Sequence, residues 1–247
     1  MNAADQALLE RRVRVAARAL GRHGLVQAWG HCSARIDEHA FLVCAPRPMG
    51  CIAPDECGTV VQIDQPLPAG VLGEVRIHQQ IYKRRADVGG VCRVMPPHVM
   101  ALSTLRQVPQ PRHGVGAFNA ACRFWDDPRL LRDDGLAAKL AQRLGDAPSI
   151  VMRANGAVTV GPCVELAAGL AWCLEDAARI DVLVRSMAPA GEAAAARLNH
   201  DEVGLRQVSS GAVFERLWDY LAGSDPEWVA DVEFAAPHWG MTRSGGT

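Results

Sequence analysis

The chain of 247 residues is long enough for one large domain, and 49% of its side chains are hydrophobic, which suffices for a sizeable core. Its 26 basic and 27 acidic side chains nearly balance, so the charge argues against a nucleic-acid partner or an anionic membrane surface. The sequence has no run of about 18 apolar residues, so we expect no membrane-spanning helix. The first twelve residues lack the apolar core of a signal peptide.

The eight cysteines are scattered and lack the CxxC spacing of a zinc site or redox motif. Cys44, Cys92 and Cys173 stand among apolar residues. This pattern is typical of reduced, buried thiols, which persist in a reducing compartment. We therefore predict a cytoplasmic protein.

The first half of the chain predicts helices separated by short strands. Residues 4–22 place apolar side chains at helical spacing opposite an arginine-rich face, and Gly21 and Gly24 end this helix. Residues 59–63 predict a strand. Another helix begins near Leu72, residues 88–95 form a buried strand, and Pro96 and Pro97 stop that strand because proline donates no backbone hydrogen bond. A further helix then starts at the sequence HVMALSTL.

Residues 72–103 also contain the first candidate functional side chains. Glu74 and His78 are four residues apart and therefore share one face of the predicted helix. Arg93 stands in the middle of the apolar strand, where an arginine is rarely fully buried without a partner. His98 follows the proline pair at the predicted helix start, where a helix N-terminus disfavours a protonated ring, so it could serve as a base or simply face solvent.

The second half begins with a long loop, QVPQPRHGVGAFNAACRFWDDP, whose length favours a functional role. Its candidate ligands are Arg112 and His113. Residues 130–144 predict an amphipathic helix, and residues 149–153 and 157–160 predict a hairpin whose turn carries Asn155. Residues 163–187 predict a long helix. The segments GEAAAARLN and SSGAVFERLWDYLAG predict two further helices.

The combination of Glu74, His78, the Ile81–Tyr82 and Asp87–Val88 pairs, and the two prolines resembles the class II aldolase/adducin superfamily over about residues 5 to 187. The resemblance implies an α/β fold with three layers, α/β/α, around a central mixed, largely antiparallel sheet. We expect one domain over residues 1–247, in which residues 188–247 form a C-terminal helical extension. The resemblance also implies a homo-oligomer, a tetramer, with the site near a subunit interface. Four aromatic residues suit either that interface or the core: Trp218, Tyr220, Trp228 and Trp239.

The resemblance further implies a divalent metal ion held by three histidines, but this chain has Arg93, Met95 and Asn155 at those positions. Arginine has no lone pair to donate and stays protonated, so it repels a dication. Methionine sulfur is a soft ligand suited to copper(I), and the asparagine carbonyl is neutral. We therefore expect no metal at this site and no other cofactor.

Two segments correspond to the part of the family that cradles a phosphate or carboxylate. In the first, Ser33 matches and could donate a hydrogen bond to the substrate, whereas His31 replaces an asparagine. A protonated His31 could hold an anion, or its ring could close a turn. In the second, Arg47 lies between two prolines and either binds a carboxylate or is merely solvated. The family's phosphate-binding serines are replaced by Leu72 and Gly73, which argues against a sugar phosphate and favours the branch resembling decarboxylases of hydroxylated aromatic acids.

These residues lead to the hypothesis of a metal-independent lyase of the decarboxylase, aldolase or hydratase type. Arg93, helped by Asn155 and by His31 or Arg47, binds a carboxylate or enolate oxygen of a small carboxylated substrate, because a preorganised donor lowers the barrier where negative charge develops. Glu74 moves the proton. His98 or His113 is the second acid or base.

Two alternatives stay open at the level of the sequence. In the first, Glu74 and Arg93 form a salt bridge that fills a dead metal site, and the protein is a non-catalytic, adducin-like relative with a binding role. In the second, a metal ion is retained by ligands at new positions, namely His78, His98 and His113.

Overall fold

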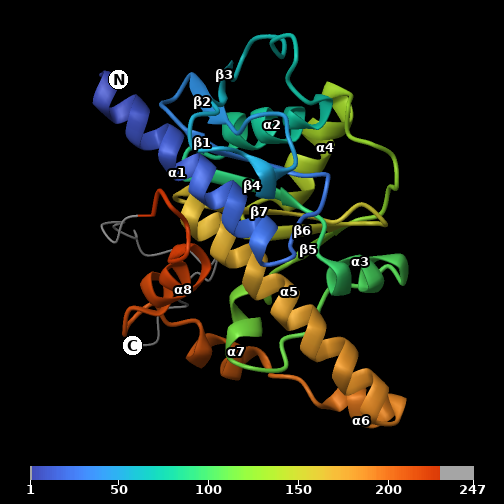
Figure 1. The fold of residues 1–247 in the computed structure, drawn as a ribbon. Helices are drawn as coiled ribbons and strands as arrows, with labels where there is room; N and C mark the ends of the chain where they lie inside the picture. The colour runs from blue at the N-terminus through green and yellow to red at the C-terminus, as the bar shows by residue number, and fades with distance from the viewer. Residues whose placement is uncertain (1, 229–247) are drawn as a thin grey trace, which may run out of the picture.

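The computed structural model describes residues 2–228 and is built around a seven-stranded sheet with the order β3-β2-β1-β4-β7-β6-β5 (Figure 1). Neighbouring strands are antiparallel, apart from the parallel pair of β5 and β6. The strands are β1 (His31–Arg35), β2 (Ala40–Val43), β3 (Thr59–Gln62), β4 (Gly90–Val94), β5 (Arg123–Trp125), β6 (Ser149–Met152) and β7 (Ala157–Gly161).

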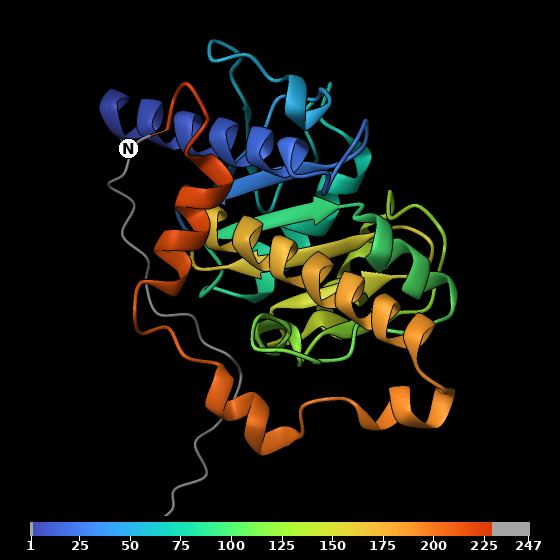
Figure 2. The same ribbon diagram turned by 60° about the horizontal axis from the view of Figure 1, so that its bottom comes forward.

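Helices cover both faces of this sheet. On one face lie α1 (Ala3–Arg22), α3 (Pro97–Thr104) and the long α5 (Val164–Met187), and on the other lie α2 (Arg76–Arg84) and α4 (Asp134–Leu144) (Figures 1 and 2). Short 3-10 turns occur at η1 (Met49–Cys51), η2 (Gly73–Val75) and η3 (Val115–Asn119). The structure confirms the predicted α/β fold with its mixed, largely antiparallel sheet. No helix within residues 2–228 combines the length and the apolar character needed to cross a membrane.

The alternation of side chains along β1 and β4 decides which residues reach the site. Cys92 and Val94 of β4 pack under α1 and α5, whereas Val91 packs under α2 and α4. Because successive side chains of a strand point to opposite faces, Arg93 shares the α2/α4 face with Val91. The same alternation brings His31 and Ser33 of β1 to that face.

Several predicted elements differ from the observed ones. The helix predicted over residues 130–144 begins at Asp134, because the Asp133 side chain accepts a hydrogen bond from the Leu136 amide and caps the helix there. Inside the predicted loop, Arg123–Trp125 pairs with β6 as an edge strand that is too short to show alternation. Cys51 and Cys57 are exposed, although Cys44, Cys92 and Cys173 are buried as expected.

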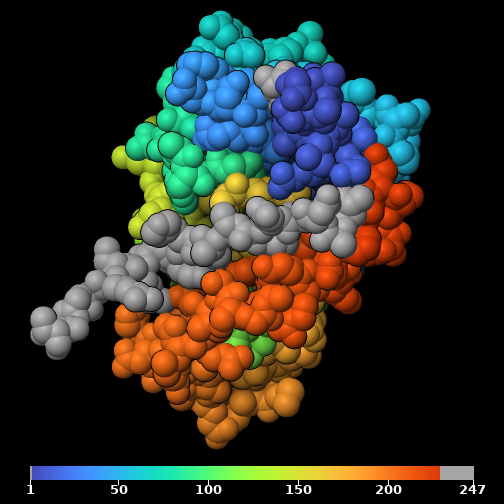
Figure 3. Space-filling model, turned by 90° about the vertical axis from the view of Figure 1, so that its left-hand side faces the viewer, coloured from blue at the N-terminus to red at the C-terminus, as the bar shows by residue number. Residues whose placement is uncertain are grey.

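The chain after α5 forms three helices where two were predicted, namely α6 (Ala190–Ala195), α7 (His200–Arg206) and α8 (Val213–Ala222). This segment returns along the molecule until α8 lies beside α1 and α5, and on one side of the surface the C-terminal helices lie below the N-terminal helix (Figures 2 and 3). Trp218 is buried in the core, whereas Tyr220 is 63% exposed. Trp239 lies outside the described residues. The division into one domain with a C-terminal extension stays a prediction.

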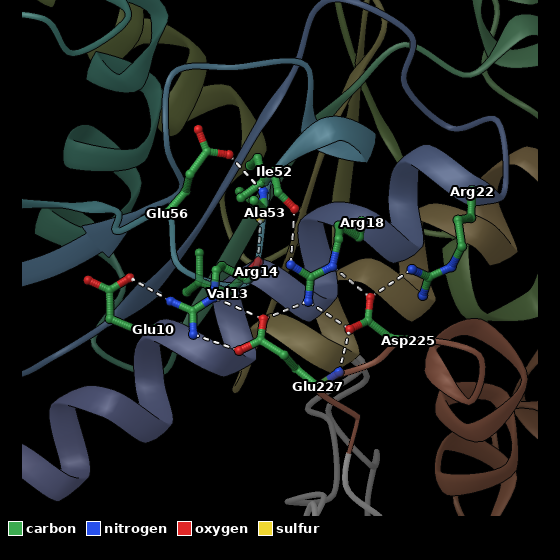
Figure 4. A network of polar contacts seen from close by, with 11 residues as sticks. Glu10, Val13, Arg14, Arg18, Arg22, Ile52, Ala53, Glu56, Asp225 and Glu227 are labelled. Carbon is green, nitrogen blue, oxygen red and sulfur yellow. Dashed lines mark hydrogen bonds and ion pairs between the residues drawn. The ribbon is translucent and has the colours of Figure 1, made fainter.

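A network of ion pairs joins the end of this segment to α1 (Figure 4). Arg18 donates to Asp225 through Nε at 2.8 Å and through Nη2 at 2.7 Å, and Nη2 also reaches Glu227 at 2.7 Å. Arg22 donates to Asp225, and Arg14 forms two hydrogen bonds to Glu227. Burial alone would raise the pKa of Asp225, but the hydrogen bonds from Arg18 and Arg22 hold it below its usual value.

Candidate functional site

A cavity of about 170 Å³ opens beside the end of β4, on the face of the sheet that α2 covers. Three loops and two single side chains form its wall. The loops are residues 28–30 with the first residue of β1, His31, then residues 46–48 after β2 and residues 72–74 before α2, and the side chains are Arg93 and Arg132. Segments that are far apart in the sequence therefore meet around this cavity, and four of the eight sequence-predicted site residues line it, namely His31, Arg47, Glu74 and Arg93.

Arg93 is a buried cation at the base of the cavity, with a side chain that is 3% exposed. Its Nη2 donates a hydrogen bond of 2.6 Å to Oδ1 of Asn155 and lies 3.4 Å from Oε2 of Glu74. Burial lowers the pKa of Arg93 and the Glu74 carboxylate opposes that shift, while arginine remains charged because its usual pKa is so high. The predicted buried charge is therefore present and faces the cavity.

Glu74 and Asn155 complete a triangle with Arg93. Glu74 lies in the 3-10 turn before α2, and its Oε1 accepts hydrogen bonds from the Asn155 Nδ2 at 3.3 Å and from the Leu131 amide at 3.4 Å. One carboxylate, one amide and one guanidinium thus hold each other in place. This arrangement orients the guanidinium while leaving the Glu74 side chain 15% exposed.

The hairpin turn between β6 and β7 carries Asn155 to Arg93. Gly156 has a φ of +77°, and a Cβ at this position would lie 2.0 Å from the carbonyl oxygen of Val94. A residue with a side chain therefore could not approach the end of β4 so closely. Gly156 lets the turn dock against β4, and the neighbouring Asn155 amide then reaches the guanidinium.

A buried chain of hydrogen bonds runs from His31 into the core under α2. Nδ1 of His31 lies 2.8 Å from Nε2 of His78, and Nδ1 of His78 lies 2.6 Å from the Ser33 hydroxyl. The Ser33 hydroxyl lies 2.9 Å from the Tyr82 hydroxyl, which donates to the Ser33 carbonyl oxygen at 3.1 Å. His31 lines the cavity, but Ser33 is fully buried and does not line it.

These contacts correct two expectations from the sequence. The hydroxyl of Ser33, expected to bind substrate, is instead used by His78 and Tyr82. His31, expected to hold an anion when protonated, is held neutral, because burial, His78 and the Arg93 cation all lower its pKa well below the usual value. The prediction that Glu74 and His78 share one face of a helix is also wrong, because Glu74 lies in the 3-10 turn before α2 and only His78 lies in α2. His78 points into the core, where burial and Arg93 lower its pKa to about 3.

His98 and His113 do not line the cavity. Nδ1 of His98 lies 2.7 Å from Glu175, which also accepts the backbone amides of His98 and Val99 and so caps α3. Nε2 of His113 lies 2.8 Å from Asp176. The expected second acid or base is thus paired with a carboxylate of α5 and is not brought together with Glu74 and Arg93.

Two further arginines lie at the cavity. Arg47 is about half exposed and pairs with Glu56 at 2.5 Å. Arg132 was not singled out from the sequence. It is exposed and stands against Gly73, where a Cβ would lie 3.1 Å from its Cγ, and it makes no ion pair within residues 2–228. Its only sequence signal is an arginine just before a helix cap, which is too common a pattern to mark a site.

The residues at the family's metal-ligand positions do not fit a divalent ion. Arg93 brings a fixed positive charge to the place where a cation would bind, and the carbonyl oxygen of Asn155 already accepts a hydrogen bond from it. The alternative metal site made of His78, His98 and His113 is not formed either. His78 is buried in the core, while His98 and His113 pair with different carboxylates. Among the described residues, no group of three histidine, cysteine or acidic side chains is placed to hold a metal ion.

Known proteins resemble this chain in sequence and in fold. A sequence model of the class II aldolase and adducin N-terminal domain matches residues 11–182, so the chain belongs to this family. It is 29% identical over 232 residues to a 3,4-dihydroxyphthalate decarboxylase from Terrabacter sp. (strain DBF63), covering 85% of this chain and 92% of that protein. A protein of the same name from Arthrobacter keyseri is 29% identical over 200 residues, covering 70% and 77% of the two chains.

The fold has a close counterpart among solved structures. An aldolase II superfamily protein from Pseudomonas syringae superimposes with a TM-score of 0.75 at 21% identity, covering 89% of this chain and 92% of the other. This likeness supports the fold alone.

Proposed function

We propose that the chain is a decarboxylase that removes a carboxylate from a hydroxylated aromatic acid, with the Arg93 cation in the role that a metal ion has elsewhere in the family. The main support for this proposal is the buried guanidinium of Arg93, which lies at the base of the cavity and is held by Glu74 and Asn155. The family and the two decarboxylase relatives support lyase chemistry on an aromatic carboxylate.

The size and charge of the cavity suit such a substrate. An enclosed cavity of about 150 Å³ can hold a benzene ring, so the volume of about 170 Å³ is adequate for a single aromatic ring. Among the described residues that line the cavity, Arg47, Arg93 and Arg132 are cationic and Glu74 carries the one carboxylate. The excess of positive charge attracts a carboxylated ligand, and Trp29, which is 68% exposed at the wall, offers an aromatic surface.

The roles of the charged groups follow from where charge moves during decarboxylation. The bond between the ring carbon and the carboxylate breaks, carbon dioxide leaves, and the electron pair stays on the ring and its oxygen substituents until the ring carbon takes up a proton. A cation that held the departing carboxylate would stabilise the ground state and slow the reaction. We therefore assign Arg93 to the oxygen on which negative charge develops, and Arg47 and Arg132 to a carboxylate that the substrate retains. Glu74 is assigned to the transfer of the proton to the ring carbon.

The test is turnover of 3,4-dihydroxyphthalate by the purified chain, followed by carbon dioxide release with and without EDTA. We expect turnover that EDTA leaves unchanged and that Glu74→Gln lowers by at least a hundredfold while the melting temperature stays within a few degrees. Turnover that EDTA abolishes would overturn the metal-independent part of the proposal. Absence of turnover with this acid and with related hydroxylated aromatic acids would overturn the decarboxylase.

A second candidate function rests on the same triangle. Arg93, Asn155 and Glu74 already bond to each other, which is also what a filled, non-catalytic site would contain. In that case the protein is an adducin-like binding partner, and neither turnover nor binding of aromatic acids at the cavity is expected. The homotetramer and the cytoplasmic location also stay predictions.

A further inference from the structure

Two buried polar atoms at the base of the cavity lack hydrogen-bond partners within residues 2–228. They are Nε2 of His31 and Nε of Arg93. The two residues are direct partners in the register of β1 and β4, and both line the cavity. Both side chains are at least 97% buried, so water outside the protein does not reach these atoms freely. Buried polar groups normally have a partner, so this pair indicates a contact with a bound group, either an ordered water or a ligand hydroxyl.

The four contacts beneath His31 can all be hydrogen bonds at the same time in only one direction, which starts at Tyr82. A tyrosine hydroxyl carries one hydrogen, and the hydroxyl of Tyr82 donates it to the carbonyl oxygen of Ser33. The Ser33 hydroxyl must then donate its own hydrogen to the Tyr82 oxygen, 2.9 Å away. The remaining lone pairs of Ser33 can only accept, so Nδ1 of His78, at 2.6 Å, is the protonated nitrogen of that ring.

The hydrogen-bond direction continues from His78 to His31. His78 is neutral, because burial keeps its pKa near 3, so its Nε2 carries no hydrogen and accepts from His31. Nδ1 of His31 is therefore the protonated nitrogen of that ring. His31 is also kept neutral by burial and by its cationic neighbour, which lower its pKa. Its Nε2 is left as a lone pair, a hydrogen-bond acceptor on the strand position that pairs with Arg93, whose Nε–H is a donor without a partner within residues 2–228.

One hydroxyl group has both the hydrogen that Nε2 of His31 can accept and the lone pair to which Nε of Arg93 can donate. Its O–H donates to Nε2 of His31, and its oxygen accepts from Nε of Arg93. A carboxylate or a methoxy group has no hydrogen to donate, so either would leave the His31 lone pair buried and unsatisfied. Nε2 of His31 and Nε of Arg93 together therefore favour a hydroxyl over a carboxylate or a methoxy group.

We propose that His31 and Arg93 form a hydroxyl-recognition site, and that Tyr82, Ser33 and His78 are positioning residues that keep Nε2 of His31 unprotonated. The inference rests on the proposed decarboxylase for the identity of the substrate. Glu74, which is proposed to move the proton to the ring carbon, lies 3.4 Å from Nη2 of the same guanidinium, so we place the hydroxyl on the ring carbon next to the one that loses its carboxylate. Negative charge that develops on that oxygen is then met by Arg93.

The first test measures the tautomers directly by NMR of the free protein with ¹⁵N-labelled histidine side chains. We expect the hydrogen on Nδ1 in both His31 and His78. In Tyr82→Phe the Ser33 hydroxyl becomes free to donate to His78, so we expect both rings to change to the Nε2–H form. Phe41→Leu is the matched control, because the Phe41 ring packs 4.9 Å from the Tyr82 ring without joining the chain, and it should leave the tautomers unchanged. A hydrogen on Nε2 of His31 in the parent protein, or no change in Tyr82→Phe, would overturn the proposal.

The second test measures ligand discrimination. The probe is 3,4-dihydroxybenzoate, the acid that remains when 3,4-dihydroxyphthalate loses the carboxylate next to its 3-hydroxyl, compared with 3,4-dimethoxybenzoate and benzoate by calorimetry. We expect the dihydroxy acid to bind at least tenfold more tightly than the other two, and His31→Leu to reduce the difference to less than twofold. Equal binding of all three by the parent protein would overturn hydroxyl recognition. A clear preference without turnover of any acid would count against the decarboxylase while leaving the recognition site intact.

Discussion

Two clusters of arginines in this molecule differ in how their charge is balanced. In the cluster that joins α1 to the C-terminal segment, three arginines meet three carboxylates (Figure 4). They are Arg14, Arg18, Arg22, Glu10, Asp225 and Glu227. Around the cavity, Arg93 meets Glu74 and Arg47 meets Glu56, whereas Arg132 makes no ion pair within the described residues.

The difference separates a cluster that stabilises the fold from one that is prepared for a ligand. A buried ion pair that lacks one partner costs the full desolvation of the charge that remains, so a stable cluster is closed and balanced. A binding site for an anion must leave cationic groups to be satisfied by that anion. The two clusters therefore predict opposite effects when an arginine is replaced.

The largest effect is expected in the balanced cluster. Arg18→Met leaves the buried carboxylate of Asp225 with only Arg22 and removes a contact of Glu227. We expect a loss of about 3 kcal/mol in the free energy of unfolding, the lower end of the range for breaking a buried pair, because Arg14 and Arg22 remain. Urea unfolding of the variant and the parent protein measures this loss. Turnover per folded molecule should stay within twofold of the parent protein, and an unchanged unfolding midpoint would mean that the network does not stabilise the fold.

Arg93→Met is expected to lower the activity strongly and the stability only slightly, the reverse of what is expected for Arg18→Met. It removes the cation assigned to the developing negative charge, so kcat should fall by roughly 10² to 10³, as for other preorganised donors. The stability should change far less than in Arg18→Met, because the Glu74 side chain is partly exposed and keeps its hydrogen bond to Asn155. Initial rates and urea unfolding of the same samples give both values. Activity within threefold of the parent protein would exclude the assigned role.

A smaller effect is expected for Arg132→Ala. Because Arg132 is exposed and assigned to substrate carboxylate, KM should rise by about tenfold while kcat stays within threefold, the result of losing uniform binding. The ratio of the variant's KM to the KM of the parent protein should shrink as the sodium chloride concentration is raised, since salt screens exposed charges. Arg129→Ala is a suitable control, because Arg129 is nearby in the same loop but pairs with Asp127 and does not line the cavity. Equal changes in both variants would argue against a specific contact.

The smallest effect is the pH dependence of the balanced cluster. Arg18 and Arg22 outweigh burial at Asp225, and Arg14 and Arg18 outweigh it at Glu227, so both carboxylates have a lower pKa folded than unfolded. The stability they contribute is therefore complete above about pH 5 and is lost as the pH falls through their lowered folded values. Melting temperatures between pH 6 and pH 3 should fall less steeply in Asp225→Asn than in the parent protein. Parallel curves would show that Asp225 does not titrate in this way.

The candidate site was only partly predictable from the sequence. The apolar strand around Arg93 predicted a buried arginine with a partner, and the hairpin turn predicted the position of Asn155, because both follow from neighbours within a few residues. The pairing of His98 with Glu175 and of His113 with Asp176 joins residues 77 and 63 positions apart, and no local pattern marks such pairs. Those two histidines were therefore expected at a cavity that they do not line.

By itself the sequence determined the family, the α/β fold with its mixed sheet, and the replacement of metal-binding side chains by Arg93, Met95 and Asn155. Only the tertiary structure decided which groups surround Arg93, that Ser33 is turned into the core and that His31 is neutral. The reason is that periodicity is set by neighbouring residues, whereas the distances and the solvation that govern charge at a site depend on how the sheet, both helix layers and the loops pack together.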